Sequence, residues 1–254
     1  MTLNTQHMEL SASDRYVHNR SAPLHRVDAP VRIIAHRCCA GEFPENTVAA
    51  ATACAGAVDA IEIDLRQSVD GTPIVFHDAT LERLTSETGP VNTKTSTELR
   101  QLTIGSSGCH IPTFREMVRA LPAEMQLNVE LKERGLGRVV AWSQSLPQDI
   151  IWSSFDHHIL QEVHAADPTA STALLYANSP SQNLQTAIDL GCSHVHPHHK
   201  LCRASVHVED AQAAGLGVNA WTVRHRTTWE QLHIAGVDGA ITDYRPGKLP
   251  GRDR

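Results

Sequence analysis

The chain has 254 residues, which suits a single α/β barrel of roughly 250 residues with a fully buried core. Its formal net charge of −6 and pI near 6.2 argue against nucleic acid or an anionic membrane surface as the main partner. Aromatic residues make up only 4%, so we expect a core built from aliphatic side chains.

The first thirty residues are polar, and their apolar positions follow neither the helix nor the strand period. We therefore expect residues 1–30 to be a weakly ordered or externally docked extension and residues 31–254 to form one domain. No stretch resembles a signal-peptide core or reaches the length of a membrane span, which favours a cytoplasmic address. The six cysteines form no CxxC pair and are expected to be reduced thiols.

From residue 31 onward, short β-type runs alternate with helix-compatible stretches, as expected for parallel strands joined by crossover helices. The predicted strands are 31–35, 60–65, 127–131, 150–152, 173–175, 194–196, 218–223 and 239–241. The predicted helices are 46–56, 113–121, 135–146, 157–166, 181–190, 205–214 and 227–235.

One segment breaks this alternation directly after the second predicted strand. Asp70-Gly71 is a strong tight-turn signal, and too few residues lie around it for a crossover helix. Residues 66–77 are therefore predicted to form a hairpin, followed by an irregular insertion over 79–110. This path would bring His77 to the same end of the fold as the end of the second strand.

Acidic residues stand at the ends of two of these strands. Residues two apart on a strand share a face, so Glu62 projects with Asp64, and Asn128 projects with Glu130 and Lys132. Buried carboxylates are costly unless they hold a cation or one another. Glu62, Asp64 and Glu130 are therefore the predicted oxygen ligands of one divalent cation, Mg²⁺ or Ca²⁺.

These clusters belong to a longer series of short motifs that resembles the glycerophosphodiester phosphodiesterase family from about residue 33 to residue 246. The motifs are His36-Arg37, Pro44-Glu45-Asn46-Thr47, Glu62-Ile63-Asp64, Asp70-Gly71, His77-Asp78, Ile111-Pro112-Thr113, Glu130-Leu131-Lys132, Trp221-Thr222-Val223 and Thr242-Asp243. The resemblance implies a TIM barrel that uses a divalent cation to hydrolyse glycerophosphodiesters to glycerol 3-phosphate and an alcohol. The expected partner is thus a small-molecule phosphodiester, while a homo-oligomer is neither indicated nor excluded.

The chemistry of a phosphodiester assigns roles to the remaining polar residues, because the anion must be neutralised and the leaving oxygen protonated. Arg37 and Lys132 would supply positive charge to the phosphoryl oxygens. His36 and His77 form an acid and base pair; His36 is expected to be the acid and His77 the base, and the sequence leaves the exchanged assignment open. In the family, a substrate hydroxyl is implied to attack phosphorus and give a cyclic phosphate that water then opens.

Several residues keep two interpretations. Glu45 and Asn46 either support the site or, in the case of Asn46, only cap a helix. Trp221 is either a barrel-layer side chain or an apolar wall for the glycerol or the leaving group. Glu62 and Asp64 could instead form structural ion pairs with Arg37 and Lys132.

The histidines of 194–199 are expected to form a solvated, polar strand end rather than a second metal site. The family usually has glycine after His-Arg, whereas this chain has Cys38, which would be strained if that position needs a positive φ. That departure motivates a rival hypothesis of a catalytically silent barrel that binds phosphodiesters. Lysophospholipase D activity is the other enzymatic alternative, ranked lower because the 79–110 insertion is polar.

Overall fold

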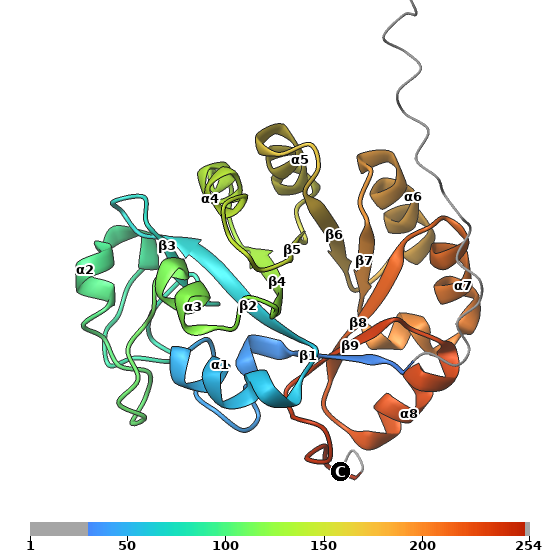
Figure 1. Ribbon diagram of the computed structural model, residues 1–254, viewed down its shortest axis with the longest axis horizontal. Coiled ribbons are helices and arrows are strands. Elements are labelled where there is room, and N and C mark those ends of the chain that lie inside the picture. Colours follow the sequence, from blue (N-terminus) through green and yellow to red (C-terminus); the bar gives the residue numbers. More distant parts are fainter. Residues whose placement is uncertain (1–29, 252–254) are drawn as a thin grey trace, which may run out of the picture.

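Eight parallel strands close into a TIM barrel in the computed structural model, which describes residues 30–251 (Figure 1). The barrel closes because β1 pairs in parallel with both β2 and β9. The barrel strands are β1 (Arg32–Ala35), β2 (Ala60–Gln67), β4 (Gln126–Leu131), β5 (Ile150–Ser154), β6 (Ser171–Tyr176), β7 (His194–Pro197), β8 (Gly217–Val223) and β9 (Gly239–Thr242). The predicted fold class and all eight predicted strands are confirmed.

Helices lie between consecutive barrel strands and form the outer layer (Figure 1). They are α1 (Val48–Cys54), α3 (Phe114–Ala120), α4 (Gly137–Ser143), α5 (His157–Ala166), α6 (Pro180–Leu190), α7 (Ser205–Ala213) and α8 (Arg226–Ala235), with single 3-10 turns η1 (His36–Cys38), η2 (Ala55–Ala57), η3 (Val91–Thr93) and η4 (His199–Arg203). Local sequence explains where they begin. The Thr113 hydroxyl accepts from the Glu116 backbone amide, and the Glu116 carboxylate accepts from the Thr113 backbone amide. The two bonds form a complete capping box. Asp156 caps α5 with a single side-chain hydrogen bond, which it accepts from the His158 amide.

The predicted hairpin after the second strand is present. β3 (Pro73–Val75) pairs antiparallel with the end of β2, and Gly71 takes a φ of 76° in the connecting turn. The insertion that follows is irregular apart from η3 and the short helix α2 (Ser96–Leu99). It has a small apolar core of its own, formed by Ile74, Phe76, Leu81, Val91, Leu99, Ile104 and Ile111.

Strand β2 is buried along most of its length because helices cover one face and the barrel interior covers the other. Two of its buried residues are the acids Glu62 and Asp64, which are 3% and 1% exposed. Charges in such a place require compensation, which directs attention to the carboxyl ends of the strands.

The termini and the cysteines complete the description. The predicted N-terminal extension lies outside the described residues, apart from its last residue, Pro30, so the domain boundary stays a prediction. The six cysteines are all free thiols, as expected. Within residues 30–251, no helix combines the length and the apolar character needed to cross a membrane.

Candidate active site

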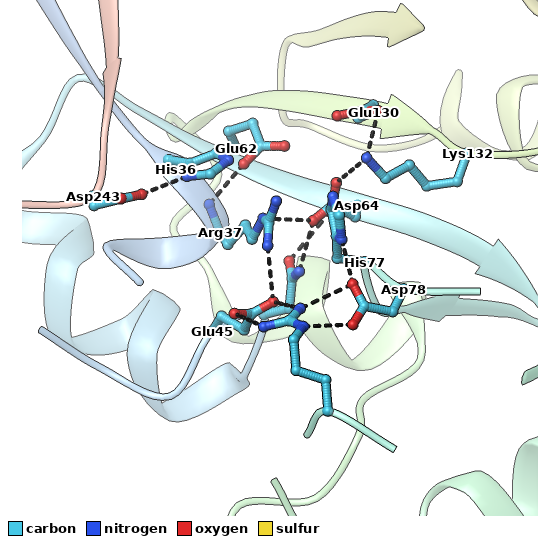
Figure 2. Close-up of polar contacts among 12 residues, drawn as sticks. His36, Arg37, Glu45, Glu62, Asp64, His77, Asp78, Glu130, Lys132 and Asp243 are labelled. Atoms are coloured by element: carbon cyan, nitrogen blue, oxygen red, sulfur yellow. Dashed lines mark hydrogen bonds and ion pairs between the residues drawn. The ribbon is translucent and has the colours of Figure 1, made fainter. Parts of the chain in front are cut away.

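A cavity of about 280 Å³ opens at the carboxyl ends of the barrel strands, the end at which barrel enzymes carry their chemistry. Its lining includes seven of the residues predicted from sequence: His36, Arg37, Glu62, His77, Glu130, Lys132 and Trp221. The contacts among most of them are drawn in Figure 2. The barrel therefore brings together residues that lie as much as 185 positions apart, from 36 to 221.

The three predicted ligand residues converge. Asp64 on β2 stands in register with Glu130 on β4, and one carboxylate oxygen from each of Glu62, Asp64 and Glu130 lies within 4.8 Å of the others. Burial, followed by the charges of Asp64 and Glu130, raises the pKa of Glu62 well above its ordinary value. Burial and then Asp64 likewise raise the pKa of Glu130 to about 7. The cluster is thus short of positive charge.

The donor set suits a hard cation. Asn128, which pairs with Glu62 in the β2–β4 register, also lines the cavity. Its buried side-chain oxygen accepts no hydrogen bond from any group in residues 30–251. Three carboxylates with an unsatisfied amide oxygen beside them are the oxygen-rich surroundings that Mg²⁺ and Ca²⁺ favour. These residues therefore fit a divalent cation, which would also offset the burial and repulsion that raise the pKa values of Glu62 and Glu130.

The predicted phosphate-binding cations lie against the same acids. Lys132 Nζ is 2.5 Å from Glu130 Oε1 and 3.1 Å from Asp64 Oδ1, while Arg37 Nε is 3.5 Å from Asp64 Oδ2. Burial opposes ionisation of Asp64, but Lys132 and Arg37 outweigh it and lower the pKa of that carboxyl. The ion pairs considered as an alternative therefore do form for Asp64, while Arg37 and Lys132 still face the cavity.

The loop after β1 reaches the acids through an unusual backbone. Arg37, Cys38 and Cys39 all have positive φ, at 47°, 64° and 63°. The turn presents the Arg37 amide to Glu62, with a nitrogen to oxygen distance of 2.6 Å. Cys38 is fully buried there. Its backbone has the left-handed conformation that favours glycine, as the sequence suggested.

The Asn46 side chain hydrogen-bonds Asp64 and does not cap the helix. Its side-chain amide donates to Asp64 Oδ2 at 2.8 Å, and its carbonyl oxygen accepts from the Asp64 backbone amide at 3.3 Å. The helix cap is Thr47, whose hydroxyl accepts from the Ala50 amide. The capping alternative for Asn46 is therefore wrong, because its positive φ of 56° turns the side chain toward the barrel.

Each candidate catalytic histidine is held at Nδ1 by a carboxylate. His36 Nδ1 lies 2.5 Å from Asp243 Oδ1 at the end of β9, and His77 Nδ1 lies 2.6 Å from Asp78 Oδ1. This arrangement leaves Nε2 of each ring for proton transfer. Burial lowers the pKa of His77, with Lys132 and Arg37 acting in the same direction and Asp64 against them.

Arg83, from the insertion, joins two of these loops. Its guanidinium donates to Asp78 from Nε at 2.5 Å and to Glu45 from Nη1 and Nη2 at 2.9 and 2.8 Å. Glu45 also accepts from Arg37 at 3.2 Å. Glu45 therefore contacts both Arg37 and Arg83, and Arg83 in turn contacts Asp78, the partner of His77.

The opposite side of the cavity is built differently. Trp221 donates from its indole nitrogen to the His196 carbonyl at 2.7 Å, which turns its ring toward the mouth. Phe155 and His198 contact that ring edge to face, with centroids 5.4 and 5.1 Å away. We call Phe155, His198 and Trp221 the ring wall. Of the two interpretations of Trp221, its place in the cavity lining supports the wall.

The expectation of a solvated strand end at 194–199 is wrong. His196 is fully buried inside the barrel and accepts from the Asn219 amide at 3.1 Å. His198 and His199 line the cavity. Alternating histidines cannot all face water on a barrel strand, because one face of the strand points into the closed interior.

Sequence reasoning assigned no role to Asp78, Arg83, Asp243 or Arg224. Asp78 and Asp243 stood inside the recognised motifs next to His77 and Thr242, so their position at strand ends was an available signal. Arg83 and Arg224 had none, because an arginine in a polar loop is ordinarily a solvated surface residue.

A parallel barrel with buried acids, paired histidines and cations around a cavity at the carboxyl ends of its strands is the architecture of a barrel enzyme with a candidate metal site. The family model described as the glycerophosphoryl diester phosphodiesterase family matches residues 36–246. The chain belongs to that family and is a phosphoric diester hydrolase.

Similar proteins agree with this assignment. A glycerophosphodiester phosphodiesterase of Caldanaerobacter subterraneus subsp. tengcongensis is 30% identical over 83% of this chain and 93% of its own length. The putative glycerophosphodiester phosphodiesterase YhdW of Bacillus subtilis is also 30% identical, over 84% and 94%. A phosphodiesterase of Oleispira antarctica, solved in complex with the product sn-glycerol-3-phosphate, has a TM-score of 0.78 and 29% identity, covering 84% of this chain and 93% of that one.

Proposed function

We propose that this chain hydrolyses glycerophosphodiesters to glycerol 3-phosphate and an alcohol, with one divalent cation and with His36 and His77 as acid and base. The observation that carries the proposal is the meeting of three carboxylates within 4.8 Å, two of which line a cavity together with two carboxylate-held histidines. The Oleispira antarctica relative, crystallised with glycerol 3-phosphate, supports the same substrate class.

Glu62, Asp64 and Glu130 would hold the cation, and the buried oxygen of Asn128 is placed to join them. When bound, a divalent cation neutralises phosphoryl oxygens and lowers the pKa of a coordinated hydroxyl. Arg37 and Lys132 add fixed positive charge on the cavity wall, where the phosphoryl group would lie. Their ion pairs with Asp64 keep both side chains in one orientation before substrate arrives.

The two histidines move the protons. His77 takes a proton from the attacking hydroxyl of the glycerol moiety, and His36 gives one to the departing alkoxide, so the bond from phosphorus to the leaving oxygen breaks as the cyclic phosphate forms. Water then opens the cyclic phosphate with the proton transfers reversed, which returns both rings to their starting state. Asp78 and Asp243 hold the rings in orientation throughout. Each transfer is worth roughly 10²–10⁴-fold in rate.

Lysophospholipase D activity is the second candidate, and one observation favours it. Phe155 of the ring wall is 51% exposed at the cavity mouth, where an acyl chain could lie against it. It ranks below the first candidate because the neighbouring walls are polar.

The test is turnover of glycerophosphocholine and of lysophosphatidylcholine, with and without a chelator, by wild type, Glu62→Gln and the exposed control Glu230→Gln. We expect glycerophosphocholine turnover that chelator abolishes and that Glu62→Gln lowers on the order of 100-fold, because a cation ligand is lost. Glu230→Gln should match wild type. Tight binding without turnover would instead support the silent barrel, and faster turnover of the lysolipid would reverse the ranking.

A further inference from the structure

One cation in the cavity lining is held very differently from the other two. Arg37 and Lys132 have side chains only 18% and 11% exposed, and each lies against at least two carboxylates. The Arg224 side chain is 57% exposed and lines the same cavity. Its Nε is 2.5 Å from Asp243 Oδ2, and its two terminal nitrogens contact no other acceptor in the described part of the chain. A planar pair of donors is therefore available at the mouth.

Asp243 links this arginine to His36. One oxygen of Asp243 binds Nδ1 of His36, and the other binds Arg224. The placement of the alcohol rests on the proposed function, in which Nε2 of His36 protonates it. Because Arg224 and His36 line the same cavity, the alcohol is released into the space that the terminal nitrogens of Arg224 border.

Apart from Asp243, its ion-pair partner, the charged groups on this side of the cavity are positive, although the whole chain carries a net charge of −6. Among residues 30–251 that line the cavity, the carboxylates are Glu62 and Glu130, on the opposite side. Lys200 and Arg203 are exposed residues of the turn η4, which directly follows His198. Burial first, and then the charges of Lys200, Arg224 and Arg203, lower the pKa of His198, so all three cations act on the same ring.

We propose that Arg224 binds the head group of the substrate and that this side of the cavity selects diesters whose alcohol carries a carboxylate. The two free donors of an arginine match the two oxygens of a carboxylate, and the anchored Nε holds the fork in place. A head group that ends in an ammonium would meet Arg224 as a like charge, and a neutral one would leave its donors to water.

Three diesters that share the glycerophosphoryl part test this proposal: glycerophosphoglycerate (anionic), glycerophosphoglycerol (neutral) and glycerophosphoethanolamine (cationic). The first two differ only by a carboxylate in place of a hydroxymethyl group. The quantity to measure is the ratio of kcat/KM for the glycerate diester to that for the glycerol diester, in wild type, Arg224→Gln and Arg224→Lys. Calorimetric binding of the same diesters to the His36→Ala variant with Ca²⁺ provides a second measure that does not depend on turnover.

We expect wild type to prefer the anionic diester over the neutral one by about tenfold, the scale of one charge-assisted contact. Arg224→Gln should abolish most of that preference through KM, and Arg224→Lys should keep part of it. Because Arg224 also contacts the carboxylate that holds His36, a fall in kcat shared by all three diesters would reflect that contact and leave the ratio as the deciding quantity.

The proposal is overturned if Arg224→Gln leaves the ratio unchanged or if wild type prefers the ethanolamine diester. Its failure is distinct from failure of the proposed function. Turnover of all three diesters at equal rates would reject only the head-group site. No turnover of any diester would reject the proposed function, and the calorimetric ratio would then still decide whether the head-group site exists.

Discussion

The two sides of the cavity are built on opposite principles. On the side formed by β1, β2 and β4, nearly every charged group is buried and bound to another, so its geometry is set before a substrate arrives (Figure 2). On the side formed by β5, β7 and β8, rings pack edge to face and Arg224, the arginine of that side among the described lining residues, is largely exposed. We therefore expect the first side to perform the chemistry, where a small displacement is costly, and the second to recognise the alcohol.

The largest test of this division uses histidines from both sides. His36→Ala and His77→Ala should each lower kcat by roughly 10²–10⁴-fold, because each removes a proton transfer. His198→Ala, on the ring wall of the same cavity, should lower kcat less than tenfold. Steady-state kinetics on glycerophosphocholine measures all three, and an equal loss for His198→Ala would break the division.

A diester with a nitrophenolate leaving group sharpens the assignment of acid and base. Nitrophenolate departs without being protonated, so the loss caused by His36→Ala should shrink by about tenfold or more relative to the natural diester. The loss caused by His77→Ala should persist, because the attacking hydroxyl still has to lose its proton. The reverse pattern would exchange the two roles.

The third test removes the link between the loops of the chemical side. Arg83→Gln should lower kcat by about tenfold, because neither Asp78 nor Glu45 is then held in place for His77 and Arg37. Arg83→Lys should recover only part of the loss, since an ammonium cannot grip both carboxylates in a planar fork. The melting temperature should stay near that of wild type because the side chain is 46% exposed.

Arg119 is an exposed arginine on α3 that forms no ion pair within residues 30–251. The variant Arg119→Gln is therefore the matched control for Arg83→Gln. It should leave kcat unchanged. A kcat for Arg83→Gln equal to that of wild type would show that the contacts of Arg83 with Asp78 and Glu45 do not contribute to catalysis.

His196, in the interior behind the ring wall, gives a pH dependence of stability. Burial, and then the charge of His194, lower the pKa of His196 well below 6.5. Below pH 6.5, His196 becomes protonated in the unfolded chain and stays neutral in the folded chain. The free energy of unfolding therefore falls as pH falls, by up to about 1.4 kcal/mol per pH unit. Urea unfolding of wild type and His196→Gln at pH 7.5 and 5.5 measures this, with a smaller decrease expected for the variant. Equal decreases would contradict it.

The smallest expected effect concerns the strained backbone beside His36. Cys38→Gly should be more stable than Cys38→Ala by about 1 kcal/mol, because both remove the thiol and only glycine accepts the positive φ without strain. The matched pair Thr52→Gly and Thr52→Ala, at an exposed position within α1, should show the opposite order by about the same amount. Thermal unfolding of the four variants would detect either order.

The sequence predicted the parts of this protein that depend on local periodicity. Alternating apolar runs located all eight barrel strands, and Asp70-Gly71 located the hairpin, because strand pairing and turn chemistry follow from short-range sterics. The spacing of Glu62, Asp64 and Glu130 on strands predicted their convergence, because parallel strands align their carboxyl ends. The roles of these residues stay predictions until they are tested.

Other features could not be predicted from the sequence, because they join residues that are distant along the chain. Nothing around Arg83 indicates Glu45, and nothing around Arg224 indicates that Asp243 also holds His36. The burial of His196 depends on which strand face the closed barrel turns inward, and the choice of Thr47 over Asn46 as helix cap depends on the turn beside Asp64.

The sequence by itself thus determined the elements, the barrel and the kinds of side chain at its mouth, since those follow from burial periods and turn preferences of a few residues. Only the tertiary structure decided which carboxylate holds which histidine, which cation is neutralised and which is left exposed. Such pairings are set by distances across a closed barrel, and electrostatic interactions depend on those distances and on burial rather than on separation along the chain.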